Sequence, residues 1–150
     1  MSNPNSDPVH HPSHYNSGSG VECLQLNACQ EYLLGNATKY MYRHQDKGVP
    51  LQDLKKALFY VDTALDCHSR QYLHIPKLFP EGTYEAFLKH EDWLATQARH
   101  DEAVWFATIR KLLFRRHYSS TSEALQMLRM RTLGLVRSLE RAVEAAEKAV

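Results

Sequence analysis

Two helical periodicities on either side of a Gly-Val-Pro turn constrain the fold of this chain more than any other feature. Residues 30–46 and 51–68 carry apolar side chains every three or four positions, and the turn occupies residues 48–50. Glycine commonly ends a helix, and proline is favoured at the start of the next one. A connection this short holds consecutive helices antiparallel, so the sequence predicts a helical hairpin. The core-facing stripe expected on its second helix consists of Leu51, Leu54, Leu58, Val61 and Leu65.

The other periodic stretches extend this prediction to an all-α fold. Helices are expected over residues 21–28, 84–99, 101–117 and 122–149. The serines and threonine of residues 119–122 offer a helix N-cap, with Thr121 or Ser122 ahead of Glu123.

Composition divides the chain into four parts. Residues 1–8 are polar, with almost nothing to bury, and are expected to be disordered. Residues 9–68 combine a histidine-containing loop with the helical hairpin. Residues 69–82 are interrupted by proline and glycine, which predicts a connector. Residues 83–150 are expected to form a helical C-terminal region packed on the first.

The last expected helix carries a heptad-like seam. Its apolar and small residues are spaced alternately by three and four positions over about three and a half repeats. Two interpretations stay open, a long core helix within one subunit and a coiled coil between subunits. Either agrees with self-association, so a homo-oligomer is expected. The seam consists of Leu125, Leu128, Thr132, Leu135, Leu139, Ala142, Ala146 and Ala149.

Charge balance and apolar patterning exclude two kinds of partner. The sequence has 18 basic and 17 acidic residues and a formal net charge of +1, so strong nucleic-acid binding is not expected. It has no run of apolar residues long enough to span a membrane and no apolar signal-peptide core. These absences predict a cytoplasmic protein without membrane association.

Cysteine and histidine spacing predicts no metal centre. The three cysteines form no CxxC pair, and the nine histidines form no HExxH motif. No permanently bound cofactor is therefore expected. Magnesium that arrives with a nucleotide stays open as a hypothesis.

One face of the first hairpin helix is suited to an anion. Asn36, Lys39, Tyr40, Arg43 and Lys47 are spaced by three or four residues and share this face. Arginine gives a planar fork for phosphate, and lysine a mobile point charge. The alternative is an ordinary solvated helix face, and spacing alone leaves both interpretations open.

Five linked motifs add a family resemblance. The chain reads HPSHY at 11–15, GVECL at 20–24, GNATKYMYR at 35–43, DKG at 46–48 and DLKKALFYV at 53–61. In this order the motifs resemble the SaV-like bacteriophage family, a domain of unknown function, over about residues 9–66. Members are described as nucleotide kinases, similar to a T7-type enzyme that phosphorylates deoxynucleoside monophosphates. The resemblance implies a phage protein of the host cytoplasm, whose ligands are a deoxynucleoside monophosphate and a triphosphate donor.

Phosphate transfer by this chain would have to use side chains on helices. The sequence contains no P-loop and no kinase-type glycine-rich loop. Lys39 and Arg43 are the candidates for neutralising the transferring phosphate, with assistance from Lys47 or Lys56. His14 is the candidate for hydrogen-bonding the phosphate or moving a proton.

The rest of the nucleotide is assigned to neighbouring residues. Tyr15 and Tyr40 offer rings that can stack on a base, and Asn36 offers an amide to the base or the sugar. Glu22 is a candidate for binding a sugar hydroxyl, a lysine, or a metal through phosphate.

Asp62 is the candidate acidic residue on the second hairpin helix. It is expected to orient Lys39 or Arg43 across the hairpin, or to hold magnesium together with Asp66. The alternative is an ordinary surface ion pair. The remaining nucleotide-binding candidates are His11, Ser13 and Tyr60.

Three hypotheses follow from these residues. The leading one is a nucleoside monophosphate kinase with its site between the HPSHY loop and the hairpin. The second is a non-catalytic nucleotide-binding protein that sequesters a host signal nucleotide. The third is a helical protein that binds a host factor and has no nucleotide affinity.

Overall fold

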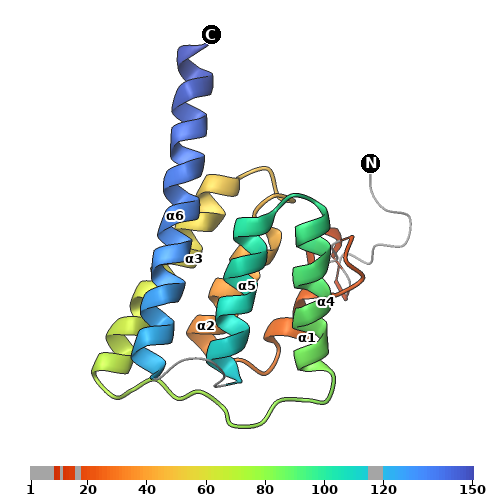
Figure 1. Ribbon diagram of the computed structural model, residues 1–150, viewed down its shortest axis with the longest axis vertical. Helices are drawn as coiled ribbons and strands as arrows, with labels where there is room; N and C mark the ends of the chain where they lie inside the picture. The colour runs from red at the N-terminus through yellow and green to blue at the C-terminus, as the bar shows by residue number, and fades with distance from the viewer. Residues whose placement is uncertain (1–8, 11, 16–17, 115–119) are drawn as a thin grey trace.

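The computed structural model describes residues 9–10, 12–15, 18–114 and 120–150, and these residues form helices and connecting segments without a β-strand. The prediction of an all-α fold is confirmed. The helices are packed side by side, and one end of the C-terminal helix stands clear of the others (Figure 1). The elements are η1 (Ser13–Tyr15), α1 (Cys23–Asn27), α2 (Tyr32–Arg43), α3 (Pro50–Ser69), α4 (Thr83–Thr96), α5 (His100–Leu113) and α6 (Thr121–Lys148).

Helices α2 and α3 form the expected hairpin. Gly48 adopts a positive φ of 77° in the turn, a conformation that costs other residues steric strain, and Pro50 opens α3. Glu31 caps α2 because its carboxylate accepts hydrogen bonds from the backbone N–H groups of Leu33 and Leu34. The buried side of α2 consists of Leu34, Gly35, Ala37, Thr38, Met41, Tyr42 and Arg43.

Helix α2 is shorter than the sequence pattern predicts. It ends at Arg43 rather than at residue 46, so Lys47 lies exposed in the turn and not on the helix face. The buried His44 follows the last helical residue. Its Nδ1 lies 2.7 Å from the carbonyl oxygen of Met41, and its Nε2 lies 3.3 Å from Oε1 of Glu102 at the start of α5. This contact with α5 takes the chain out of the helix before Lys47.

The second half of the chain completes one hydrophobic core with the hairpin. Helix α6 packs against α3 and α5, and α4 packs against α5 and α1. Trp105 is fully buried, and its indole Nε1 donates a hydrogen bond to Thr132 Oγ1 on α6 at 2.8 Å. The seam of α6 is thus an internal core contact along its first half.

The second half of α6 has no such contact. Every residue from 141 to 150 is exposed, including Ala142, Ala146 and Ala149 of the expected seam, and this end projects beyond the other helices (Figure 1). The N-cap of α6 is Ser120, whose Oγ accepts a hydrogen bond from Glu123 N at 3.1 Å. The cap therefore lies within the expected stretch 119–122, one residue before Thr121.

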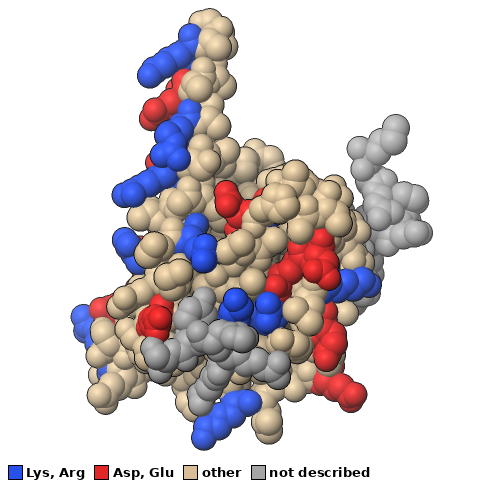
Figure 2. All heavy atoms as spheres, viewed as in Figure 1, with Lys and Arg blue, Asp and Glu red and all other residues tan. Residues whose placement is uncertain are grey.

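The visible surface carries charges of both signs. Basic and acidic side chains are interspersed over the face seen in Figure 2, and they alternate along the projecting end of α6. Within the described ranges, no helix combines the length and apolar character that crossing a membrane requires.

Candidate functional site

The segments that carry the sequence motifs meet around one buried guanidinium group. Arg43 of α2 is 8% exposed, and its Nη1 donates a hydrogen bond to the hydroxyl of Tyr15 at 2.8 Å. Its Nε lies 3.4 Å from Oδ2 of Asp53, which comes from the first turn of α3 and is 1% exposed. Arg43 therefore ties η1, α2 and α3 together at one point.

Three cations surround the ring of Tyr40 beside this arginine. The Nζ of Lys39 lies 4.7 Å from the ring centroid, the Cζ of Arg43 4.7 Å and the Nζ of Lys56 5.4 Å. The ring also stacks on Tyr60 of α3, with centroids 5.8 Å apart and planes at 14°. A cation near an aromatic face is attracted by the quadrupole of the ring, so Tyr40 holds positive charge in place. We call these five residues the Tyr40 cluster.

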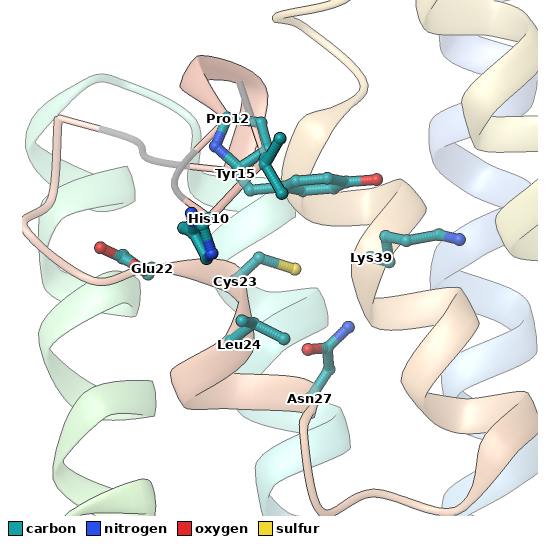
Figure 3. Close-up of a pocket in the computed structure, with 9 residues that line it drawn as sticks. His10, Pro12, Tyr15, Glu22, Cys23, Leu24, Asn27 and Lys39 are labelled. Atoms are coloured by element: carbon teal, nitrogen blue, oxygen red, sulfur yellow. The ribbon is translucent and has the colours of Figure 1, made fainter. Parts of the chain in front are cut away.

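A pocket of about 270 Å³ opens next to the cluster, between the segment that precedes α1, α1 itself and α2. Tyr15 extends over it towards α2, and the amide of Asn27 points into it from α1 (Figure 3). Lys39 belongs to both the pocket and the Tyr40 cluster, so the two adjoin. The residues that line this N-terminal pocket are Val9, His10, Pro12, Tyr15, Glu22, Cys23, Leu24, Asn27 and Lys39.

One polar atom of a residue that lines the pocket lacks a hydrogen-bond partner in the described part of the chain. The Nδ2 of Asn27 donates to the carbonyl oxygen of Gly35 at 3.2 Å, which fixes the orientation of the amide. Its Oδ1 is buried and has no hydrogen-bond partner among the described residues. A buried acceptor without a partner costs free energy, and a donor on a ligand would remove that cost.

Cys23 contributes an inert wall to the pocket. Burial raises the pKa of its thiol to about 12, although the charges of Lys39 and Arg43 act in the opposite direction. The thiolate is the nucleophilic form of cysteine, so Cys23 is not a nucleophile near neutral pH. Cys23 is thus packed as a small apolar residue, whereas Cys29 is exposed.

His90 of α4 anchors the segment that precedes α1. Its Nδ1 lies 3.0 Å from Ser19 Oγ, and its ring stacks on Tyr42 with centroids 5.0 Å apart. Burial lowers the pKa of His90 to about 4, and the positive charge of Arg99 acts in the same direction. The ring is therefore neutral at neutral pH and serves packing.

Several candidate residues lie together at this site. Tyr15, Glu22 and Lys39 line the N-terminal pocket, and the Tyr40 cluster holds the others. Glu22 also begins α1, where its backbone N–H donates to Gln25 Oε1 at 2.6 Å. The candidates in the Tyr40 cluster are Lys39, Tyr40, Arg43, Lys56 and Tyr60.

Other candidates lie elsewhere or cannot be placed. The amide of Asn36 donates to the carbonyl oxygen of Tyr32 in its own helix at 2.8 Å. Ser13 and Lys47 are exposed and do not line the pocket. His11 lies outside the described residues, and so does the side chain of His14.

Asp62 faces away from the site. Its Oδ1 accepts a hydrogen bond from Arg129 Nε of α6 at 2.6 Å, because this side of α3 packs against α6. Asp66 pairs with Arg70 one turn further along. The expected orientation of Lys39 or Arg43 by Asp62 is not present. Among the described residues, no group of three or more histidine, cysteine or acidic side chains could hold a metal ion.

Neither Asn27 nor the pairing of Asp53 with Arg43 was predicted from the sequence. Asn27 lies at the end of a five-residue helix, where no periodic pattern distinguishes it. Asp53 had a usable signal, since it stands in the first turn after Gly-Val-Pro, opposite the last turn of α2, where Arg43 lies.

Chemically, the site offers a half-open pocket with the ring of Tyr15 and the amide of Asn27 in its wall, next to the positively charged Tyr40 cluster. Such a combination suits an anion that carries a flat polar ring.

Comparison with known proteins gives one match. No curated protein and no solved structure matches this chain. Residues 9–62, the stretch that carries both the N-terminal pocket and the Tyr40 cluster, match the model of a family described as a protein of unknown function, DUF3310.

Proposed function

We propose that this protein binds a mononucleotide, with the base and sugar in the N-terminal pocket and the phosphate at the Tyr40 cluster. The observation that carries the proposal is the position of Lys39, which belongs to both places. A pocket of about 270 Å³ is small for a ligand site, which favours one nucleotide over a dinucleotide.

Each part of the ligand has a partner of matching chemistry. Tyr15 and Asn27 both line the pocket, so they offer the base a stacking surface and an amide group. Lys39 and Lys56 offer charge to the phosphate. Arg43 supports the site indirectly, because it is buried and already holds Tyr15 and Asp53.

Titration calorimetry with each deoxynucleoside monophosphate tests this proposal. We expect Lys39→Ala to weaken binding at least tenfold, since it removes a charge-assisted contact of about 1.5–3 kcal/mol. Lys47→Ala is the matched control, because Lys47 is predicted on the same face by spacing but lies exposed in the turn. Binding of none of the nucleotides, or equal loss in both variants, would reject the proposal.

Phosphorylation of the bound nucleotide is the second candidate. The SaV-like resemblance supplies this activity, and two lysines beside one ring support it, because phosphoryl transfer depends on positioning and charge neutralisation. In this version a phage enzyme of the host cytoplasm would transfer phosphate from a triphosphate donor, with magnesium entering on the donor.

Product chromatography separates a kinase from a binding protein. The protein is incubated with a deoxynucleoside monophosphate, ATP and magnesium, and diphosphate is the product expected of a kinase. Binding without diphosphate would leave the non-catalytic nucleotide-binding protein. Absence of both would leave the hypothesis of a helical protein that binds a host factor.

A further inference from the structure

The outer surface of the hairpin carries four connected aromatic rings, which we call the aromatic face: Tyr32, Tyr40, Phe59 and Tyr60. Tyr60 is the central ring, in edge contact with Tyr32 at 6.3 Å and with Phe59 at 5.4 Å, and stacked on Tyr40. Tyr32 is 72% exposed and Phe59 63% exposed. Neither of these two lines the N-terminal pocket, so this face extends beyond the proposed nucleotide site.

Basic side chains border these rings. Lys55 and Lys56 line an open hollow of about 480 Å³ on α3 together with Phe59. Lys56 also lies beside Tyr40, whereas Lys55 is within 3.5 Å of Glu140. The hollow is completed by Leu51 and Gln52.

Glu140 of α6 pairs with Lys55 and not with Lys56, and the acidic residues of α3 have other partners. Asp53 is buried against Arg43, Asp62 is hydrogen-bonded to Arg129 of α6, and Asp66 pairs with Arg70. The aromatic face therefore presents exposed rings together with positive charge.

We propose that the aromatic face binds single-stranded nucleic acid. Unpaired bases have π-faces that stack on aromatic side chains, and their phosphates pair with nearby lysines. A purely apolar partner would gain nothing from Lys56, and a mononucleotide would leave Tyr32 and Phe59 uncovered.

The dimensions and charge limit the strength of this binding. The hollow and the rings extend along α3 from Gln52 to Tyr60, eight residues or about 12 Å at the rise of an α-helix, so the binding surface is short. With Lys39 and Lys56, the two lysines beside Tyr40, on phosphates, the logarithm of the binding constant should fall with the logarithm of salt concentration with a slope of about −1.4. The net charge of +1 agrees with weak binding.

Fluorescence anisotropy with a short labelled oligodeoxythymidylate at low salt tests the proposal. Phe59→Ala and Tyr32→Ala should each weaken binding by roughly five- to a hundredfold, since each removes one stacking surface. Both side chains are exposed, so the fold should survive, and circular dichroism verifies this. A duplex of the same length should bind more weakly, because its bases are already stacked on one another.

Two control variants remove an exposed tyrosine and an exposed lysine that lie outside the aromatic face. Tyr72 is 78% exposed beyond the end of α3, and Lys77 is exposed in the connector. The Tyr72→Ala and Lys77→Ala variants should bind the oligonucleotide as tightly as the unmodified protein does. The Lys56→Ala variant should bind it more weakly.

The test also distinguishes this face from the N-terminal pocket. Phe59→Ala and Tyr32→Ala should retain mononucleotide binding, so failure of the oligonucleotide alone would overturn this proposal and leave the pocket proposal intact. Equal binding of duplex and single strand, or equal loss in Tyr72→Ala, would also overturn it. A dimer in sedimentation that Phe59→Ala dissociates would assign the face to a second copy of the chain instead.

Discussion

Asp53 lies against Arg43 inside the hairpin, with its Oδ2 3.4 Å from the guanidinium Nε and both side chains almost fully buried. Neither carboxylate oxygen of Asp53 has a hydrogen-bond partner among the described residues. The two residues therefore compensate each other by charge, and each depends on the other to tolerate burial.

Asp53→Ala should lower the free energy of unfolding by about 3 kcal/mol, because it leaves the guanidinium of Arg43 buried without a counter-charge. Urea denaturation measures this change. Asp66→Ala serves as the control, since its pair with Arg70 is solvent-exposed and should contribute less than about 1 kcal/mol. The double variant Arg43→Met with Asp53→Leu should recover most of the stability, and failure to do so would contradict the account of mutual compensation.

Stability should fall as the pH is lowered through the range in which His90 titrates. Burial lowers the pKa of His90 to about 4, from an ordinary value of 6.5. Between these values the unfolded chain binds more protons than the folded chain, so protons favour unfolding. The loss between pH 6.5 and pH 4 should approach about 3 kcal/mol.

Urea titrations at a series of pH values check this expectation. Asn in place of His90 should flatten the pH dependence in this range, although the substitution also lowers stability at neutral pH. His74→Asn is the control, because His74 is exposed and its removal should leave the pH dependence unchanged. An unaltered profile in His90→Asn would assign the pH dependence to other groups.

The periodic part of this fold is predictable from sequence, but side-chain pairing is not. The stripe of α3 could be identified because helical spacing determines which residues share a face. The partner of Asp62 could not, because Arg129 lies 67 residues away. Likewise, a basic stripe on α2 predicts equal exposure for Arg43 and Lys47. Arg43 is buried beside Asp53 of α3, whereas Lys47 lies past the end of α2.

The heptad spacing of α6 likewise does not predict which of its residues are buried. The spacing that places Leu125 and Leu128 in the core continues unchanged into Ala142 and Ala146, which are exposed. Spacing describes one helix, whereas burial depends on how far its neighbours extend. Most of the N-terminal pocket escaped prediction because non-helical segments and the very short helix α1 line it.

Cys23, the first residue of α1, and Cys29, two residues after its end, should differ in reactivity. Cys29 is exposed, whereas Cys23 is buried and burial raises the pKa of its thiol to about 12. A chromogenic disulfide reagent at mildly alkaline pH should label Cys29 promptly and Cys23 only after denaturant is added. Mass spectrometry of the labelled peptides identifies the sites, and rapid labelling of Cys23 in the native protein would contradict its burial.

Gly134 should tolerate a side chain and gain stability from it. It lies within α6, is exposed, and has open space where a Cβ would stand. Gly134→Ala should raise the free energy of unfolding by about 1 kcal/mol, because alanine has a higher helix propensity. A thermal denaturation curve reports the gain. Gly20→Ala is the contrast, since its φ of +76° would strain any other residue.

Residues 141–148 extend α6 into solvent for roughly 12 Å. An isolated helix of that length would not persist in water, because starting a helix is unfavourable. Here the packed half of α6 already supplies the first turns, so each further turn only has to propagate. The projecting end is thus helical because the packed half of α6 nucleates it, and its helicity should decrease with distance from that half. Its amide protons should exchange on a gradient towards the C-terminus, independent of the stability of the core.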